Sequence, residues 1–152
     1  MDRLEIKLNG KNRELFINTD DSLLNVLRAN GVKSVKGSCK TASCGNCTVL
    51  VEGKPILSCS YLAKRAQGKE ITTIEGVQNE VADLITYFNE EGAIQCGFCN
   101  SSVVLTIYAM TNDLGCDITD EQIRHYLNGN VCRCSGYLCQ MRAIRRYLGG
   151  LK

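Results

Sequence analysis

Hydrophobic positions in the first half of the chain follow the two-residue period of β-strands. Leu4, Ile6 and Leu8 alternate with polar residues, and Asn9-Gly10 is a hairpin turn signal that leads into a return strand over 14–18. Residues 22–30 instead have the apolar spacing of a helix, which Gly31 ends in the usual C-terminal position. Further strands are predicted over 47–51 and 71–74. The first half is therefore expected to combine strands with one helix.

After residue 76 the hydrophobic period becomes that of helices. Apolar residues recur at helical spacing in four segments, which are 81–88, 103–110, 123–127 and 144–148. Thr119 and Gln122 form a capping-box pattern at the start of the third segment. Four helices joined by short connections predict a bundle. The pattern predicts two small domains, residues 1–76 and residues 77–152.

Four cysteines of the first half have the spacing of an iron–sulfur site. Cys39, Cys44 and Cys47 read C-x4-C-x2-C, and Cys59 follows from a separate segment. This is the plant-type spacing for a [2Fe–2S] cluster held by four thiolates. The small residues between the cysteines leave backbone N–H groups free to approach the sulfur atoms, and such hydrogen bonds stabilise the reduced cluster.

A second group of four cysteines lies in the helical half. Cys96 and Cys99 form C-x2-C, and Cys132 and Cys134 form C-x-C after 32 intervening residues. Each pair precedes an apolar helical run, so its thiolates are expected at a positive helix N-terminus, which favours an anionic cluster. A second [2Fe–2S] cluster would connect the second and fourth helices of the bundle.

Three other uses of the cysteines compete with iron. Ten cysteines in 152 residues are fewer than a disulfide scaffold needs, and the start of the chain, Met1 to Lys7, lacks the apolar core of a signal peptide. A reducing, cytoplasmic compartment is therefore expected. Structural zinc remains open, although C-x-C and C-x4-C-x2-C are not the usual zinc knuckles. A catalytic thiolate needs a nearby base, but the single histidine, His125, is predicted on a helix surface or interface. Cys116 and Cys139 are predicted to be ordinary free thiols.

Composition limits the partners of the chain. With 44% hydrophobic and 22% charged residues it has the make-up of a soluble globular protein, and no segment approaches the length of a membrane span. The net charge of +2 and the pI near 8.0 indicate no basic domain. Neither nucleic acid nor a membrane is therefore expected as a partner.

Together these motifs resemble the small iron–sulfur subunit of the xanthine dehydrogenase, or molybdenum hydroxylase, family. The resemblance is carried by Cys-Thr-Val at 47–49, by Gln95 to Cys99 and by Gly129 to Tyr137. It implies an α+β fold, with an N-terminal β-grasp domain like that of plant-type ferredoxins followed by a C-terminal four-helix bundle that binds the second [2Fe–2S] cluster. Ala42 stands where relatives usually have glycine, so different backbone angles are expected in the first cysteine loop.

The resemblance also implies a heteromeric oxidoreductase whose chemistry takes place on other subunits. A large subunit would hold molybdopterin and the substrate, and a medium subunit would hold FAD. Electrons would pass from molybdenum to the cluster of the helical domain, then to the ferredoxin-like cluster and the flavin. Gln95 would hydrogen-bond the pterin, and Cys134 would lie near it.

The substrate is not encoded in this chain. Xanthine or another purine is the first assignment, and nicotinate, aldehydes, carbon monoxide and aromatic thioesters are alternatives. Two other classes of protein remain open, a freestanding [2Fe–2S] carrier or redox sensor and a zinc-stabilised adaptor.

Overall fold

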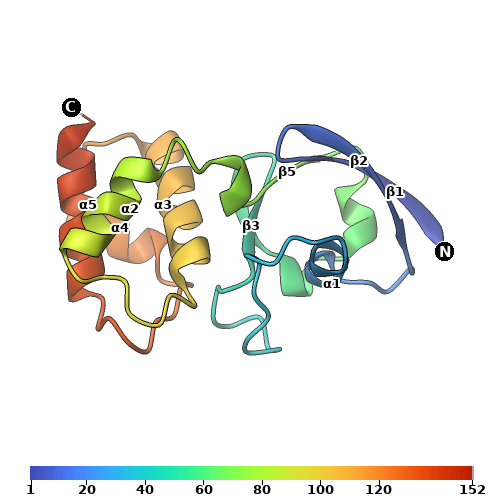
Figure 1. Cartoon of the computed structure of the whole chain (residues 1–152), viewed down its shortest axis with the longest axis horizontal. Helices are drawn as coiled ribbons and strands as arrows, with labels where there is room; N and C mark the ends of the chain where they lie inside the picture. The colour runs from blue at the N-terminus through green and yellow to red at the C-terminus, as the bar shows by residue number, and fades with distance from the viewer. Residues whose placement is uncertain (152) are drawn as a thin grey trace.

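The two halves of the chain lie side by side along the longest axis of the molecule (Figure 1). The computed structural model describes residues 1–151. The strands are β1 (Asp2–Leu8), β2 (Lys11–Ile17), β3 (Thr48–Val51), β4 (Lys54–Leu57) and β5 (Glu70–Thr72), and the helix of this half is α1 (Leu23–Ala29). The second half contains α2 (Ala82–Glu90), α3 (Asn100–Leu114), α4 (Asp120–Tyr126) and α5 (Leu138–Gly150). This is the α+β composition that the hydrophobic pattern predicts.

The strands form one mixed sheet in the order β2-β1-β5-β3-β4. β1 pairs with β5 in parallel, and the other pairs are antiparallel. Three short 3₁₀ helices, Ser58–Ser60, Ala63–Ala66 and Ile74–Gly76, connect or follow the strands. Leu4, Ile6 and Leu8 all point into the core between the sheet and α1, as their alternation predicts.

The last strand is shorter than the predicted segment 71–74, and that prediction was wrong at its end. The backbone N–H of Thr73 donates to the side-chain Oδ1 of Asn9 over 2.8 Å instead of continuing the ladder with β1. Ile74 then begins a 3₁₀ turn. A side-chain acceptor thus replaces the strand partner and ends β5.

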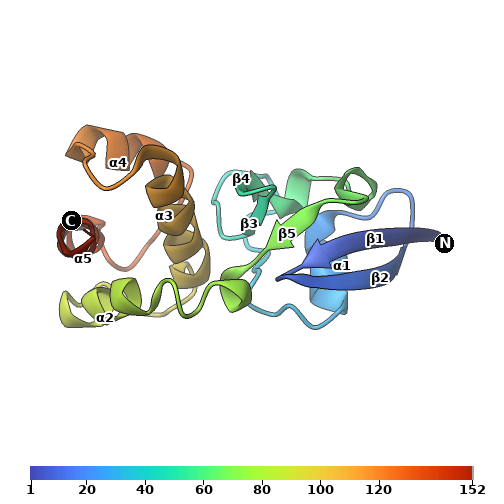
Figure 2. The ribbon, with the colours of Figure 1, turned by 90° about the horizontal axis from the view of Figure 1, so that it is seen from above.

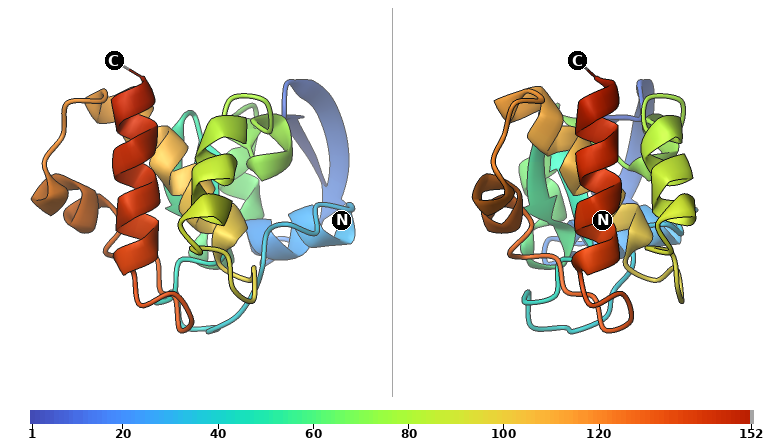
Figure 3. Two further views of the ribbon diagram at one scale, coloured as in Figure 1. Left: turned by 60° about the vertical axis from the view of Figure 1, so that its left-hand side comes forward. Right: turned by 90° about the vertical axis from the view of Figure 1, so that its left-hand side faces the viewer.

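The helices of the second half surround a separate group of buried side chains. Phe88, Leu105, Ile107, Ile123 and Ile144 are among its fully buried members. α3 lies between the other helices and the sheet, and α5 runs between α2 and α4 in the end-on view (Figures 2 and 3). The predicted capping box begins α4, where the Thr119 hydroxyl accepts from the backbone N–H of Gln122.

The two halves contact one another through α3 and through loops. Leu50 of β3 packs into the helical core, and the Ser101 hydroxyl donates to the carbonyl oxygen of Ser34 over 2.9 Å. The backbone N–H of Val131 donates to the carbonyl oxygen of Cys44 over 2.9 Å. These contacts fix the loops that carry the cysteines relative to one another. Within residues 1–151, no helix is both long and apolar enough to cross a membrane.

Candidate metal centres

Seven of the eight proposed ligands lie on loops, and Cys59 lies in the 3₁₀ helix Ser58–Ser60. In Figure 1 the loops coloured cyan, yellow and orange-red, which carry these seven cysteines, reach the lower side of the molecule. Cys39, Cys44, Cys47 and Cys59 line one cavity of about 380 Å³, together with Ser38, Lys40, Thr41, Ala42 and other residues of the loop and of α1. The structure therefore brings the first predicted group together around one space.

Backbone donors in this loop point at Cys39. The N–H groups of Thr41 and Ser43 lie 3.5 and 3.4 Å from its Sγ. These donors lower the pKa of the Cys39 thiol to about 5, so this thiol ionises most readily. At Cys59, burial and the neighbouring Cys47 thiol raise the pKa to about 11. A bound cation would have to offset that cost, because metal ligation requires the thiolate.

Two non-glycine residues of the first cysteine loop adopt the left-handed backbone conformation. Lys40 has a φ of +58° and Ala42 a φ of +56°. The alanine thus takes a conformation that glycine favours, and the substitution from the family pattern does not force Ala42 out of the left-handed region. The altered backbone angles expected at this position relative to the family stay a prediction.

The second group is assembled from two distant loops. The thiols of Cys99 and Cys132 are neighbours, and so are those of Cys96 and Cys134. Burial, with the adjacent Cys132, raises the pKa of Cys99 to about 12. For Cys132, burial acts in the same direction but is outweighed by hydrogen bonds from Ser135, so its pKa is lowered. The four sulfur atoms thus form one electrostatically coupled set.

Helix starts contribute differently to the two pairs. Cys99 is the N-cap residue of α3, as predicted. Cys132 and Cys134 are separated from α5 by a turn in which Gly136 and Tyr137 take positive φ values, so this pair does not lie directly at a helix N-terminus. Hydrogen-bond donors of a neighbouring residue contact this pair instead. The backbone N–H and the hydroxyl of Ser135 lie 3.4 and 3.2 Å from the Sγ of Cys132.

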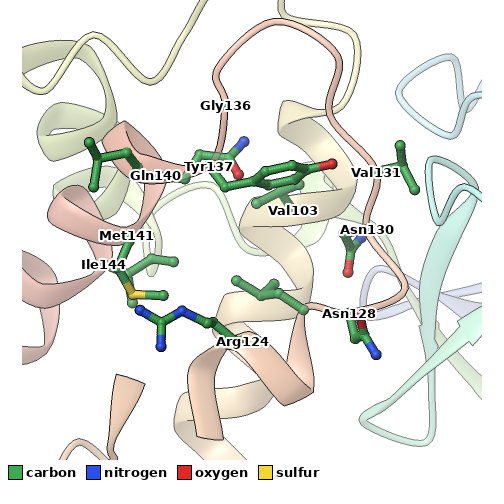
Figure 4. A pocket seen from close by; sticks show the side chains of 12 residues that line it. Val103, Arg124, Asn128, Asn130, Val131, Gly136, Tyr137, Gln140, Met141 and Ile144 are labelled. Carbon is green, nitrogen blue, oxygen red and sulfur yellow. The ribbon is translucent and has the colours of Figure 1, made fainter. Parts of the chain in front are cut away.

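Ser135 and Gln140 are site residues that the sequence patterns did not identify. Gln140 is buried on α5, and its Nε2 lies 4.0 Å from the Sγ of Cys99. No spacing in the sequence marks Gln140, because its partner depends on burial that only the folded structure shows. Gln140 also borders an apolar cavity of about 540 Å³ between α3, α4, α5 and the loop that carries Asn130 and Val131 (Figure 4).

The remaining predicted residues occupy different environments. Gln95 and Cys134 are both exposed, and Gln95 donates through Nε2 to the carbonyl oxygen of Gly92 over 2.9 Å. Cys116 and Cys139 are partly buried against the helical core, and Cys116 lies in the connection between α3 and α4. His125 is exposed on α4, on the helix surface where it was predicted.

The donor sets are compatible with [2Fe–2S] clusters. Across residues 1–151, no three His, Cys, Asp or Glu side chains converge as ligands of one metal ion. A [2Fe–2S] cluster needs only two thiolates at each iron, spread over the width of the cluster. The four thiols of the first group surround a cavity and N–H donors point at Cys39, and in the second group the Ser135 hydroxyl points at Cys132.

Comparison with known proteins identifies a [2Fe–2S]-binding domain in each half of the chain. A family model described as "2Fe-2S iron-sulfur cluster binding domain" matches residues 6–74, and one described as "[2Fe-2S] binding domain" matches residues 73–145. The small FeS subunit of nicotinate dehydrogenase from Eubacterium barkeri is 38% identical, over 93% of this chain and 92% of that protein. The chain belongs to the family of molybdenum hydroxylase iron–sulfur subunits.

Other proteins match this chain with similar identity and coverage. The xanthine dehydrogenase iron–sulfur-binding subunit of Escherichia coli O157:H7 is 39% identical, over 88% of this chain and 86% of that protein. A chain of quinoline 2-oxidoreductase from Pseudomonas putida 86 superimposes with a TM-score of 0.90 at 31% identity, covering 97% of this chain and 92% of that one. The chain is thus an iron–sulfur subunit of an oxidoreductase complex, with catalysis on partner subunits.

Proposed function

We propose that this subunit conducts electrons within a heteromeric molybdopterin-dependent hydroxylase. It would accept electrons from a molybdenum site on a large partner subunit and deliver them, through two [2Fe–2S] clusters, to FAD on a medium subunit. The observation that carries the proposal is the gathering of eight thiols into two groups of four, each with hydrogen-bond donors directed at its sulfur atoms. We also propose a cytoplasmic location, where a reducing environment preserves thiolate ligands.

The proposal assigns the ligands and the domains as the sequence predicts them. The first cluster would be held by Cys39, Cys44, Cys47 and Cys59, and the second by Cys96, Cys99, Cys132 and Cys134. Residues 1–76 would form a ferredoxin-like β-grasp domain and residues 77–152 a four-helix bundle. Support for this division comes from the two separate groups of buried side chains.

The residues of this chain would set the direction and ease of electron flow. When bound, each cluster supplies one-electron redox chemistry. Thr41, Ser43 and Ser135 would stabilise the added negative charge, because their N–H and O–H groups already point at ligand sulfur atoms. No protein proton needs to move, since the donors keep their hydrogen atoms throughout.

Contacts with the molybdopterin subunit are proposed at the exposed end of the second site. Gln95 would donate to the pterin, and Cys134 would lie beside it. Both side chains are exposed, so a partner subunit can reach them without unfolding the loop. Gln95 now donates to the carbonyl oxygen of Gly92, an exposed residue, and this exposed hydrogen bond is readily exchanged for one to another acceptor.

Purine oxidation, with xanthine as the first substrate to test, is our proposal for the holoenzyme. Nicotinate is the second candidate, because a nicotinate dehydrogenase subunit matches this chain over more of its length at nearly the same identity. Aldehydes, carbon monoxide and aromatic thioesters remain further alternatives. The substrate contacts would lie on the large subunit.

The test is anaerobic purification of this subunit with whatever chains accompany it, followed by visible spectra after adding xanthine, nicotinate or dithionite. Bleaching of the iron–sulfur bands by xanthine is expected. Bleaching by nicotinate or by dithionite alone would retain the electron-transfer role and reject the purine assignment. A purified subunit without accompanying chains would favour a freestanding carrier, and a colourless zinc protein would reject the proposal.

A further inference from the structure

The two cysteine loops touch one another through their backbones. Cys44, in the first group, accepts at its carbonyl oxygen the N–H of Val131, which directly precedes Cys132 of the second group. The donor and acceptor atoms are 2.9 Å apart. A path made of covalent bonds and this single hydrogen bond therefore connects the Sγ atoms of Cys132 and Cys44.

This approach depends on the missing side chain of Gly45. A Cβ atom built on Gly45 would lie 2.2 Å from the carbonyl oxygen of Gly129 and 3.0 Å from both Cα and Nδ2 of Asn130. Backbone atoms cannot yield as the end of a flexible side chain can. Any other residue at position 45 would therefore push the two loops apart.

Residues beside the contact are buried, although Val131 itself is 47% exposed. Gly45 is buried, and Asn46 and Asn130 are 7% and 9% exposed. Asn130 covers Gly45 and faces the cavity shown in Figure 4. Within residues 1–151, Oδ1 of Asn46 and Nδ2 of Asn130 have no hydrogen-bond partner, although unpaired buried polar atoms are costly.

Proximity matters for the proposed electron transfer. The rate of tunnelling falls exponentially with the gap between two redox centres, and it falls faster through empty space than along bonds and hydrogen bonds. We propose that Gly45 is a positioning residue for electron transfer between the two clusters, because it permits the Val131–Cys44 contact. This inference rests on the proposed function. The step moves one electron, so one cluster is oxidised as the other is reduced, and no bond or proton changes place.

The test compares Gly45→Ala with Gly53→Ala in the complex purified with its partner subunits. Gly45 and Gly53 have nearly the same positive φ, +74° and +77°, but a Cβ at Gly53 would meet no atom within 4 Å. Both variants thus carry the same backbone strain, and only Gly45→Ala separates the loops. Iron content and the electron paramagnetic resonance signals of both dithionite-reduced clusters are recorded first.

Two further readouts distinguish positioning from folding. The magnetic coupling between the reduced clusters is measured at low temperature, and electron redistribution is followed after a pulse of methyl viologen radical. Gly45→Ala is expected to retain both cluster signals, weaken the magnetic coupling and slow the redistribution severalfold, because the gap between the clusters widens. Gly53→Ala is expected to match the wild type. Unchanged coupling and rate in a fully loaded Gly45→Ala complex would overturn the inference.

If Gly45→Ala fails to load the first cluster, a second variant tests whether the Val131–Cys44 contact supports electron transfer. Replacing the Val131 backbone amide by an ester removes the N–H donor and leaves the first loop intact. The same slowing is expected there, and a wild-type rate would overturn the inference. Absence of both cluster signals from the wild-type complex would instead reject the proposed function.

Discussion

The hydroxyl of Ser135 lies 3.2 Å from the Sγ of Cys132, and its backbone N–H lies 3.4 Å from the same atom. Two donors from one residue thus converge on a single proposed ligand. Hydrogen bonds to a ligand sulfur stabilise the reduced, more negative cluster and raise its potential.

Ser135→Ala is therefore expected to lower the potential of the second cluster. The shift should be at most about 60 mV, which for a one-electron couple corresponds to ~1.4 kcal/mol, about one hydrogen bond to a charged group. A redox titration followed by paramagnetic resonance measures it. Ser135→Thr, which keeps the hydroxyl, should retain the wild-type potential, and an equal shift in both variants would contradict the assignment.

Single ligand substitutions should remove one cluster at a time. Cys47→Ser is expected to abolish the signal of the first cluster, and Cys132→Ser that of the second, each leaving about half of the wild-type iron. Iron analysis and paramagnetic resonance provide the measurement. Cys116→Ser is the matched control, because Cys116 lies in the connection between α3 and α4 outside both groups, and it should retain all of the iron. Iron loss in that control would refute the ligand assignment.

Core truncations should affect the two halves separately. Phe88 and Leu27 are both fully buried, but in different groups of side chains. Phe88→Ala should destabilise the helical half by about 3–5 kcal/mol and Leu27→Ala the sheet half by about 2–5 kcal/mol, through lost burial and the cavity left behind.

Thermal release of each cluster, followed by its own resonance signal, tests this prediction. Phe88→Ala should release the second cluster at a lower temperature than the first, and Leu27→Ala should reverse that order. Simultaneous loss of both clusters in both variants would mean that the chain unfolds as one unit, contrary to the proposed division at residue 76.

Glu75 should make stability depend on pH. Partial desolvation raises the pKa of Glu75, but hydrogen bonds from Thr73 and Ser34 outweigh it and hold the pKa below its ordinary value of 4.5. The stability that the carboxylate contributes is therefore complete above pH 4.5 and is lost as the pH falls through the lower pKa of the folded state.

Glu75→Gln should thus cost less than about 1 kcal/mol at neutral pH, since the side chain is exposed, and should reduce the loss of stability on acidification. Urea unfolding of the apoprotein at neutral pH and below pH 4.5 measures both effects. Glu80→Gln, at another exposed carboxylate, serves as the control. If the free energy of unfolding depends on pH in the same way in Glu75→Gln and in the wild type, Glu75 does not contribute to the loss of stability in acid.

The sequence alone predicted most of the elements and the two cysteine groups of this protein, but it did not predict strand β4 (Lys54–Leu57). Alternation at Leu4, Ile6 and Leu8 predicts a strand, and the spacings around Cys39 and Cys96 predict metal ligands, because both depend on residues close together in the chain. The end of the last strand was predicted incorrectly, because the partner that ends it, Asn9, comes from a distant turn.

Tertiary structure decided which groups act on each sulfur and how the two sites meet. The low pKa of Cys39 and the high pKa of Cys59 follow from donors and burial that only the folded loop creates. The backbone contact between Cys44 and Val131 joins segments far apart in sequence, and no local period or ligand spacing can specify it. Close approach of distant backbone is a property of packing, which patterns in the sequence constrain only indirectly.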